Sequence, residues 1–165
     1  MTLRRFLSSL LVVLAVFGLV TACGSDSDNG SDATPTNETG PCPFSGTTAA
    51  QDLAGEPAPA TITSADPQTD GCIDNVQLKF TPALAASKFA YDGDTPVLVV
   101  TLSNTTLGGG LEAGTTQSPK NLNHVQKVEV ATTQGDVQVK LTLDEKRPFL
   151  VSSSQVPAEI ELSIG

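Results

Sequence analysis

The sequence has little of the chemistry on which most enzymes depend. It contains a single histidine, His124, so zinc centres built from several histidines are excluded. It has no Gly-x-Ser-x-Gly segment, which removes the nucleophile elbow of serine hydrolases. A lone histidine at the start of a strand is more often structural than catalytic. The sequence therefore predicts a protein that is not an enzyme and holds no metal and no cofactor.

Aromatic and basic residues are also scarce. The chain has no tryptophan and one tyrosine, so a broad platform of rings stacked on sugars is not expected. Nine basic residues stand against eighteen acidic ones, and removal of Arg4 and Arg5 with a signal peptide would leave seven, for a formal charge of −11. A strongly acidic surface repels phosphate backbones and anionic headgroups. Nucleic-acid binding and electrostatic docking on a membrane are therefore not expected.

The first 22 residues have the layout of a signal peptide. Arg4 and Arg5 precede an uncharged run over residues 6–20. As a helix this run would span roughly 22 Å, less than the roughly 30 Å hydrocarbon core of a membrane. Residues 20–23 read Val-Thr-Ala-Cys and resemble the lipobox of bacterial lipoproteins, which implies cleavage before Cys23 and lipid on its thiol. The alternative is an ordinary secretory cleavage site beside an incidental cysteine. We expect a lipid-anchored protein on the extracytoplasmic face of the cell membrane.

Composition divides the chain after the signal peptide into two parts. Residues 23–40 comprise the lipidated cysteine and a polar segment in which Ala33 is the one apolar side chain after Cys23. Such a segment cannot bury enough apolar surface to offset the entropy of ordering, which predicts a disordered tether. Residues 41–165 are enough for one domain with one core, centred on about 71–165.

Two cysteines remain once Cys23 carries lipid. Cys42 and Cys72 form an even pair in an oxidising compartment, which favours a disulfide. Closing a loop of about thirty residues would contribute roughly 3.5 kcal/mol in the chain-entropy model. A metal site is the weaker alternative, because this spacing with one distant histidine fits no zinc motif.

Alternation of apolar residues predicts that the domain is all-β. The period of two is strict in residues 75–80, 136–143 and 159–164. The middle of residues 96–102 is apolar throughout, which predicts a central strand covered on both faces. A break in alternation between Val125 and Val128 predicts a bulge in a strand over 124–131.

Shorter stretches complete the expected architecture. They predict strands at 60–63, 87–91 and 149–153, and a long glycine-rich loop at 107–117. About eight short strands without a long amphipathic helix favour a single β-sandwich or a flattened barrel.

Three short motifs carry a resemblance to a known family. Residues 74–80 look like an opening strand with an Asp before alternating apolar residues, and 125–130 look like a later strand. Residues 141–149 end in Arg-Pro-Phe after an acidic-basic turn. Together they resemble the AMIN-like domain of actinobacterial lipoproteins, although Asn75 stands where an arginine is expected and Cys72 lies near the place of an aromatic residue.

The resemblance implies a β-sandwich without catalysis, whose relatives direct partner domains to peptidoglycan or the division site. We therefore expect a membrane-anchored module that binds peptidoglycan or an envelope protein; the alternative is a lipoprotein that carries a small hydrophobic ligand. Asp144, Lys146 and Arg147 are the candidate ligand contacts. The competing interpretation is a charged turn in which Pro148 begins a strand and Phe149 fills the core.

Overall fold

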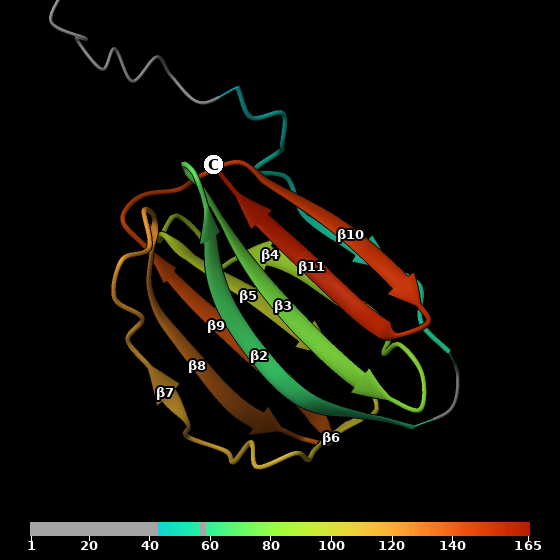
Figure 1. Ribbon diagram of the computed structural model, residues 1–165. Coiled ribbons are helices and arrows are strands. Elements are labelled where there is room, and N and C mark those ends of the chain that lie inside the picture. Colours follow the sequence, from blue (N-terminus) through green and yellow to red (C-terminus); the bar gives the residue numbers. More distant parts are fainter. Residues whose placement is uncertain (1–42, 57–58) are drawn as a thin grey trace, which may run out of the picture. The chain divides into compact units, whose positions relative to one another are not determined.

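The computed structural model describes residues 43–56 and 59–165. This part of the chain is all-β: two sheets are stacked face to face, and none of the described residues is helical (Figure 1). The proposed signal peptide and tether, with Cys23 and Cys42, lie outside the described residues, so the lipid site and the disulfide stay predictions. No helix within the described ranges is long and apolar enough to cross a membrane.

One sheet has six strands in the order β1-β4-β5-β9-β8-β7, and all of its neighbours run antiparallel. In that order the strands are β1 (Gln51–Leu53), β4 (Ser87–Tyr91), β5 (Val97–Leu102), β9 (Asp136–Leu143), β8 (Val125–Thr133) and β7 (Thr116–Gln117).

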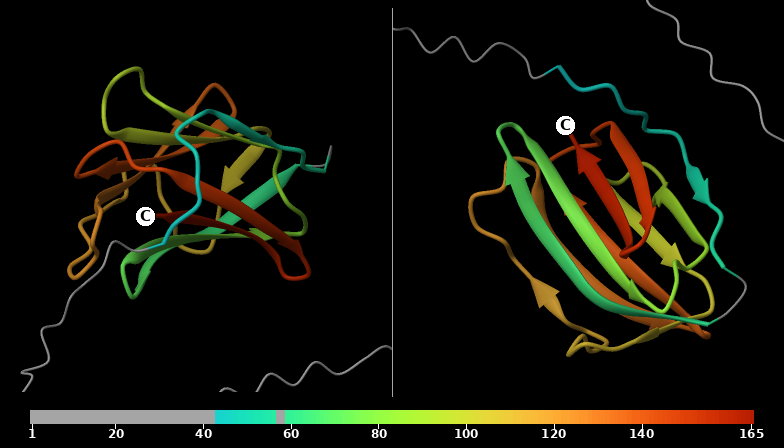
Figure 2. Two further views of the ribbon diagram at one scale, coloured as in Figure 1. Left: turned by 90° about the horizontal axis from the view of Figure 1, so that it is seen from above. Right: turned by 45° about the vertical axis from the view of Figure 1, so that its right-hand side comes forward.

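The other sheet has five strands in the order β10-β11-β3-β2-β6, with one parallel pair between β2 and β6. The strands are β10 (Phe149–Gln155), β11 (Ala158–Ile164), β3 (Ile73–Thr81), β2 (Ala60–Asp70) and β6 (Thr105–Leu107). Figure 2 shows the two layers from two further directions. The sheets do not close into a barrel, which confirms the sandwich and excludes the flattened barrel.

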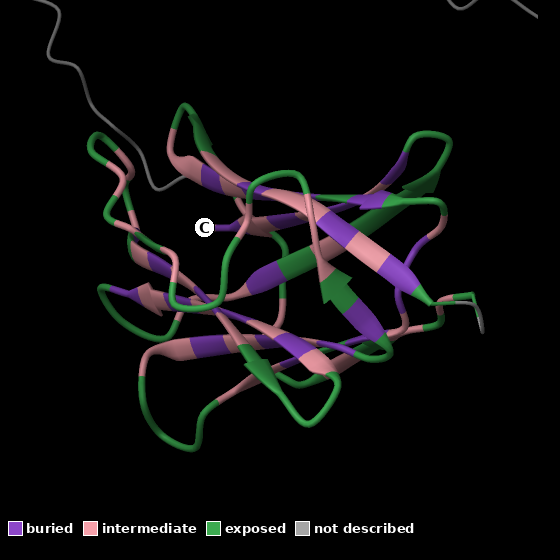
Figure 3. Ribbon diagram, turned by 90° about the horizontal axis from the view of Figure 1, so that it is seen from below, coloured by how far each residue is buried: buried purple, intermediate pink, exposed green. Residues whose placement is uncertain are grey.

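Strict alternation produced strands with one buried face, as predicted. In β9 every second residue is buried, and β11 and β3 show the same pattern. Figure 3 shows buried residues alternating with less buried ones along strands of the domain. The inward side chains meet between the sheets in one continuous apolar core. Its largest fully buried members are Phe89, Phe149, Ile62, Leu78, Leu84, Leu98, Leu102, Leu141, Leu143, Ile160, Leu162 and Ile164.

Local sequence also accounts for the bulge in β8 and for the turn between β8 and β9. The predicted bulge in β8 is confirmed, because the register against β9 shifts between Val125 and Lys127. The β8–β9 hairpin turns at Gln134 and Gly135, whose φ angles are 51° and 93°, and two positive values are what a two-residue hairpin turn with the right twist requires.

Candidate functional site

The candidate ligand contacts Asp144, Lys146 and Arg147 lie in the turn between β9 and β10, and this 144–147 turn is closed on itself. The Arg147 guanidinium donates to Asp144 through Nη2 at 2.8 Å and Nε at 3.3 Å, and Nη2 also lies 2.9 Å from Glu145 Oε1. The hydrogen bond from Arg147 lowers the pKa of Asp144 to about 2, although partial burial opposes the shift. The arginine fork is therefore engaged within the turn.

Tyr91, at the end of β4, fastens the turn to the six-stranded sheet. Its hydroxyl donates to the Arg147 carbonyl oxygen at 2.6 Å and accepts from the Arg147 backbone N–H at 3.0 Å. Its ring meets the fully buried Phe149 edge-on, with centroids 6.1 Å apart. Lys146 Nζ donates to the Gly93 carbonyl at 2.7 Å and lies 5.5 Å from the centre of the Tyr91 ring. These contacts favour a structural role for the turn.

Asp74 forms a second polar cluster, where β3 meets the entry to β8. Its carboxylate is fully buried and accepts backbone hydrogen bonds from Asn123 at 2.9 Å, His124 at 2.6 Å and Val125 at 2.9 Å. Burial alone would raise the pKa of Asp74, but these bonds outweigh burial and lower the pKa. Asp74 therefore pins the start of β8 to the opposite sheet.

The sequence contained a signal for this role. Asp74 is in phase with Val76, Leu78 and Phe80, the buried residues of β3, so the alternation itself turns a carboxylate inward. A buried carboxylate needs several hydrogen-bond donors. The resemblance had pointed to an Asp at this place but not to its partners, because the donors come from a loop about fifty residues later.

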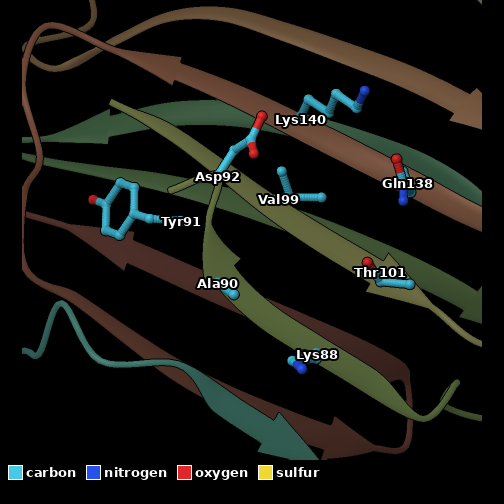
Figure 4. A pocket seen from close by; sticks show the side chains of 8 residues that line it. All are labelled: Lys88, Ala90, Tyr91, Asp92, Val99, Thr101, Gln138 and Lys140. Carbon is cyan, nitrogen blue, oxygen red and sulfur yellow. The ribbon is translucent and has the colours of Figure 1, made fainter. Parts of the chain in front are cut away.

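An open hollow lies elsewhere, on the outer face of the six-stranded sheet. It is a groove of about 370 Å³ formed by β4, β5 and β9 (Figure 4). We call it the outer groove; its lining residues are Lys88, Ala90, Tyr91, Asp92, Val99, Thr101, Gln138 and Lys140. A second hollow, of about 510 Å³, shares Lys88 with the outer groove and is otherwise lined by Asp52, Leu53, Ala54, Ala86, Ser87 and Ser103.

The groove is hollow because short side chains lie between long ones. In the register of the sheet, Lys88 faces Thr101, which faces Gln138 on the next strand. In the adjacent row Ala90 and Val99 stand beside Lys140, and all these residues point away from the core because strand side chains alternate between faces. Ala90, Val99 and Thr101 thus form a low floor.

One prediction for β5 is wrong, and the reason bears on function. The strand is central, between β4 and β9, but it is covered on one face and not on both. Leu98, Val100 and Leu102 are fully buried, whereas Val97, Val99 and Thr101 are half-buried on the outer face. A two-layer sandwich has no third layer to cover that face. An uninterrupted apolar run in such a fold was therefore a signal that valines line an outer surface.

Nothing in the described ranges favours an enclosed apolar pocket between the sheets. The facing side chains form one packed core, and Leu78, Leu98, Leu141 and Ile160 are 0% exposed. Within the same ranges no three His, Cys, Asp or Glu side chains gather as metal ligands. The outer groove is open, and its lining combines lysine, threonine and glutamine side chains with a low apolar floor, which suits an extended ligand with polar groups better than a small hydrophobic one.

Comparison with known families agrees with this architecture. The family model of the AMIN domain matches residues 62–162, more than half of the chain. The match includes every strand of the outer groove, the buried Asp74 and the 144–147 turn. Among curated proteins, none matches this sequence.

Proposed function

The chain belongs to the AMIN domain family, and we propose that it binds cell-wall peptidoglycan through the outer groove while a lipid on Cys23 holds it at the membrane. AMIN domains are non-catalytic, peptidoglycan-binding domains of extracytoplasmic proteins. The observation that carries the proposal is the groove itself, an open hollow of about 370 Å³ with a mixed polar and apolar lining, which adjoins a second hollow at Lys88. Two adjoining open hollows on the surface suit a polymer, which extends beyond both ends of its binding site.

The location of the protein forms the second half of the proposal. A lipid on Cys23 would anchor the chain, and the segment up to residue 40, as a flexible coil, would span roughly 22 Å root-mean-square. The domain would then stay within a few tens of Å of the membrane. Replacement Cys23→Ala should abolish labelling by a fatty-acid analogue and move the protein from the membrane to the soluble fraction. Continued labelling would refute the assignment.

Cosedimentation with purified cell-wall sacculi tests the binding half. The full-length protein, purified in detergent, should sediment with sacculi and remain in solution without them. A protein that stays in solution at low salt refutes peptidoglycan binding and directs the search to an envelope protein as partner.

A matched pair of variants distinguishes the outer groove from the 144–147 turn. Lys140→Gln removes a charge from the groove, whereas Arg147→Ala removes a guanidinium that is already bound by Asp144 and Glu145. We expect weaker binding for Lys140→Gln and binding within about twofold of wild type for Arg147→Ala. The reverse result, with both variants folded, would transfer the site to Asp144, Lys146 and Arg147.

A further inference from the structure

Four lysines of the described ranges, Lys79, Lys88, Lys120 and Lys140, form none of the ion pairs found there, and two of the four line the outer groove. Lys127, Lys146 and Arg147 each form an ion pair with a neighbouring carboxylate. Lys88 and Lys140 form none of the ion pairs found in the described part of the chain, yet both line the groove. Each has a carboxylate as its cross-strand neighbour, Asp52 opposite Lys88 and Glu129 opposite Lys140. Glu129 pairs with Lys127 and Asp52 forms none of these ion pairs, so both ammonium groups can still bind an anionic group of a ligand.

The distance between Lys88 and Lys140 limits the length of the ligand segment that can contact both. Lys88 and Lys140 belong to adjacent rows of the sheet on strands separated by β5. Strand spacing and rise place their Cα atoms about 12 Å apart. Val99 and Thr101 of the low floor lie between them, and the Gln138 amide, beside Lys140 on β9, can donate and accept hydrogen bonds. The spacing fits a short ligand segment with anionic groups several bonds apart and amides between them.

Two carboxylates near the outer groove further restrict the class of ligand that it can bind. Asp92 lines the groove at one end, and Asp52, the cross-strand neighbour of Lys88, lines the hollow that adjoins the groove at Lys88. Along this path the surface therefore presents a carboxylate, two ammonium groups and another carboxylate. A chain of repeated phosphates would be repelled at both ends, whereas a segment that carries isolated carboxylates and an amine is complementary.

Resting on the function proposed above, we propose that the outer groove recognises the peptide stem of peptidoglycan and not its glycan strand. The stem is a short peptide with free carboxylates, backbone amides and the side-chain amine of a diamino acid. Lys88 and Lys140 hold its carboxylates, Thr101 and Gln138 bond its amides, and Asp92 faces the amine. The scarcity of exposed aromatic rings agrees with this, because the lining contains Tyr91 alone and its hydroxyl is engaged by Arg147.

Three preparations of cell wall separate the possible ligands, each tested by cosedimentation with the full-length protein in detergent. Sacculi and sacculi freed of phosphate polymers by acid should bind equally, and glycan strands whose stems an amidase has removed should not bind. Binding to the stripped glycan overturns the inference and leaves the proposed function standing. Loss of binding after acid identifies a phosphate polymer and overturns both, as does failure to bind any preparation.

Charge-matched variants assign the contact to the groove. Lys88→Gln and Lys140→Gln should each weaken binding about three- to tenfold, as expected for a charge-assisted contact at a surface. Lys79→Gln is the control: it removes the same charge from an exposed position on β3, in the other sheet. Lys140→Arg, which keeps the charge, should bind within about twofold of wild type. Equal losses in the control and the groove variants would indicate non-specific attraction and overturn the inference.

A competition experiment tests the stem directly. A synthetic stem peptide with free carboxylates should displace the wild-type protein from sacculi, and the same peptide with its carboxylates converted to carboxamides should be at least tenfold less effective. Equal competition by the two peptides would contradict the roles of Lys88 and Lys140.

Discussion

Asp74 offers the sharpest test of how this fold is held together. Its buried carboxylate accepts hydrogen bonds from three consecutive backbone N–H groups, those of Asn123, His124 and Val125. Asp74→Ala leaves all three donors without an acceptor and should lower the free energy of unfolding by about 3–5 kcal/mol. Asp74→Asn keeps one acceptor oxygen, loses the charge and turns an amide toward the donors, which should cost about 2–3 kcal/mol.

The pH dependence of stability tests the hydrogen bonds of Asp74 independently. The folded-state pKa of Asp74 lies below the ordinary value of 3.8, because the hydrogen bonds outweigh burial. A carboxyl with a lowered folded-state pKa contributes stability that is fully present above its unfolded value and lost as the pH falls through the folded one. Wild type should therefore lose stability as the pH falls below about 4, and Asp74→Asn should lose less over that window.

Urea denaturation of the full-length chain, followed at pH 7 and again near pH 3, measures both quantities. Asp66→Asn is the matched control, because Asp66 lies half-buried on β2 opposite Gln77. The role of Asp74 is refuted if the free energy of unfolding of Asp74→Asn stays within about 0.5 kcal/mol of wild type at pH 7, the range expected for an ordinary surface substitution. The same conclusion follows if this variant loses as much stability as wild type between pH 7 and pH 3.

Three further predictions concern the stability of the domain. Tyr91→Phe removes the hydroxyl that bonds both backbone groups of Arg147 and should cost about 1–2 kcal/mol in thermal unfolding; an unchanged melting temperature would contradict the clamp. Phe149→Ala empties a fully buried site and should cost about 3–5 kcal/mol, with less than about 1 kcal/mol arguing against its place in the core. Reduction of a Cys42–Cys72 disulfide should lower the free energy of unfolding by about 3.5 kcal/mol, and no response to reductant would refute the pairing.

Strand formation followed from sequence wherever the apolar alternation was strict. Residues 136–143 were predicted as a strand with the bounds that β9 has, and the shorter stretch 87–91 also matches β4. β2 was predicted over 60–63 but continues to Asp70, because its later residues, apart from the buried Ala65, are half-buried or exposed and gain their strand geometry from pairing with β3. Backbone hydrogen bonds to a neighbouring strand do not require alternating apolar residues, so this part of β2 could not be predicted from the sequence pattern.

The shortest strands escaped prediction for the same reason. β1, β6 and β7 have two or three residues each, too few for any period to show, and each pairs at the edge of a sheet. β7 lies inside the stretch predicted as a loop over 107–117. Their partners, not their own side chains, decide where they form.

The sequence by itself determined the β class, the buried face of each regular strand, the bulge in β8 and the burial of Phe149, because period, parity and turn residues are local properties. It also placed an Asp at the head of β3 and a polar turn at 144–147. Only the tertiary structure decided that Asp74 binds the entry to β8, that Arg147 is bound by its own turn and that the outer face of β5 is open. These outcomes depend on which strands become neighbours. Lys88 and Lys140, about fifty residues apart in the chain, line one groove because β5 pairs with both of their strands.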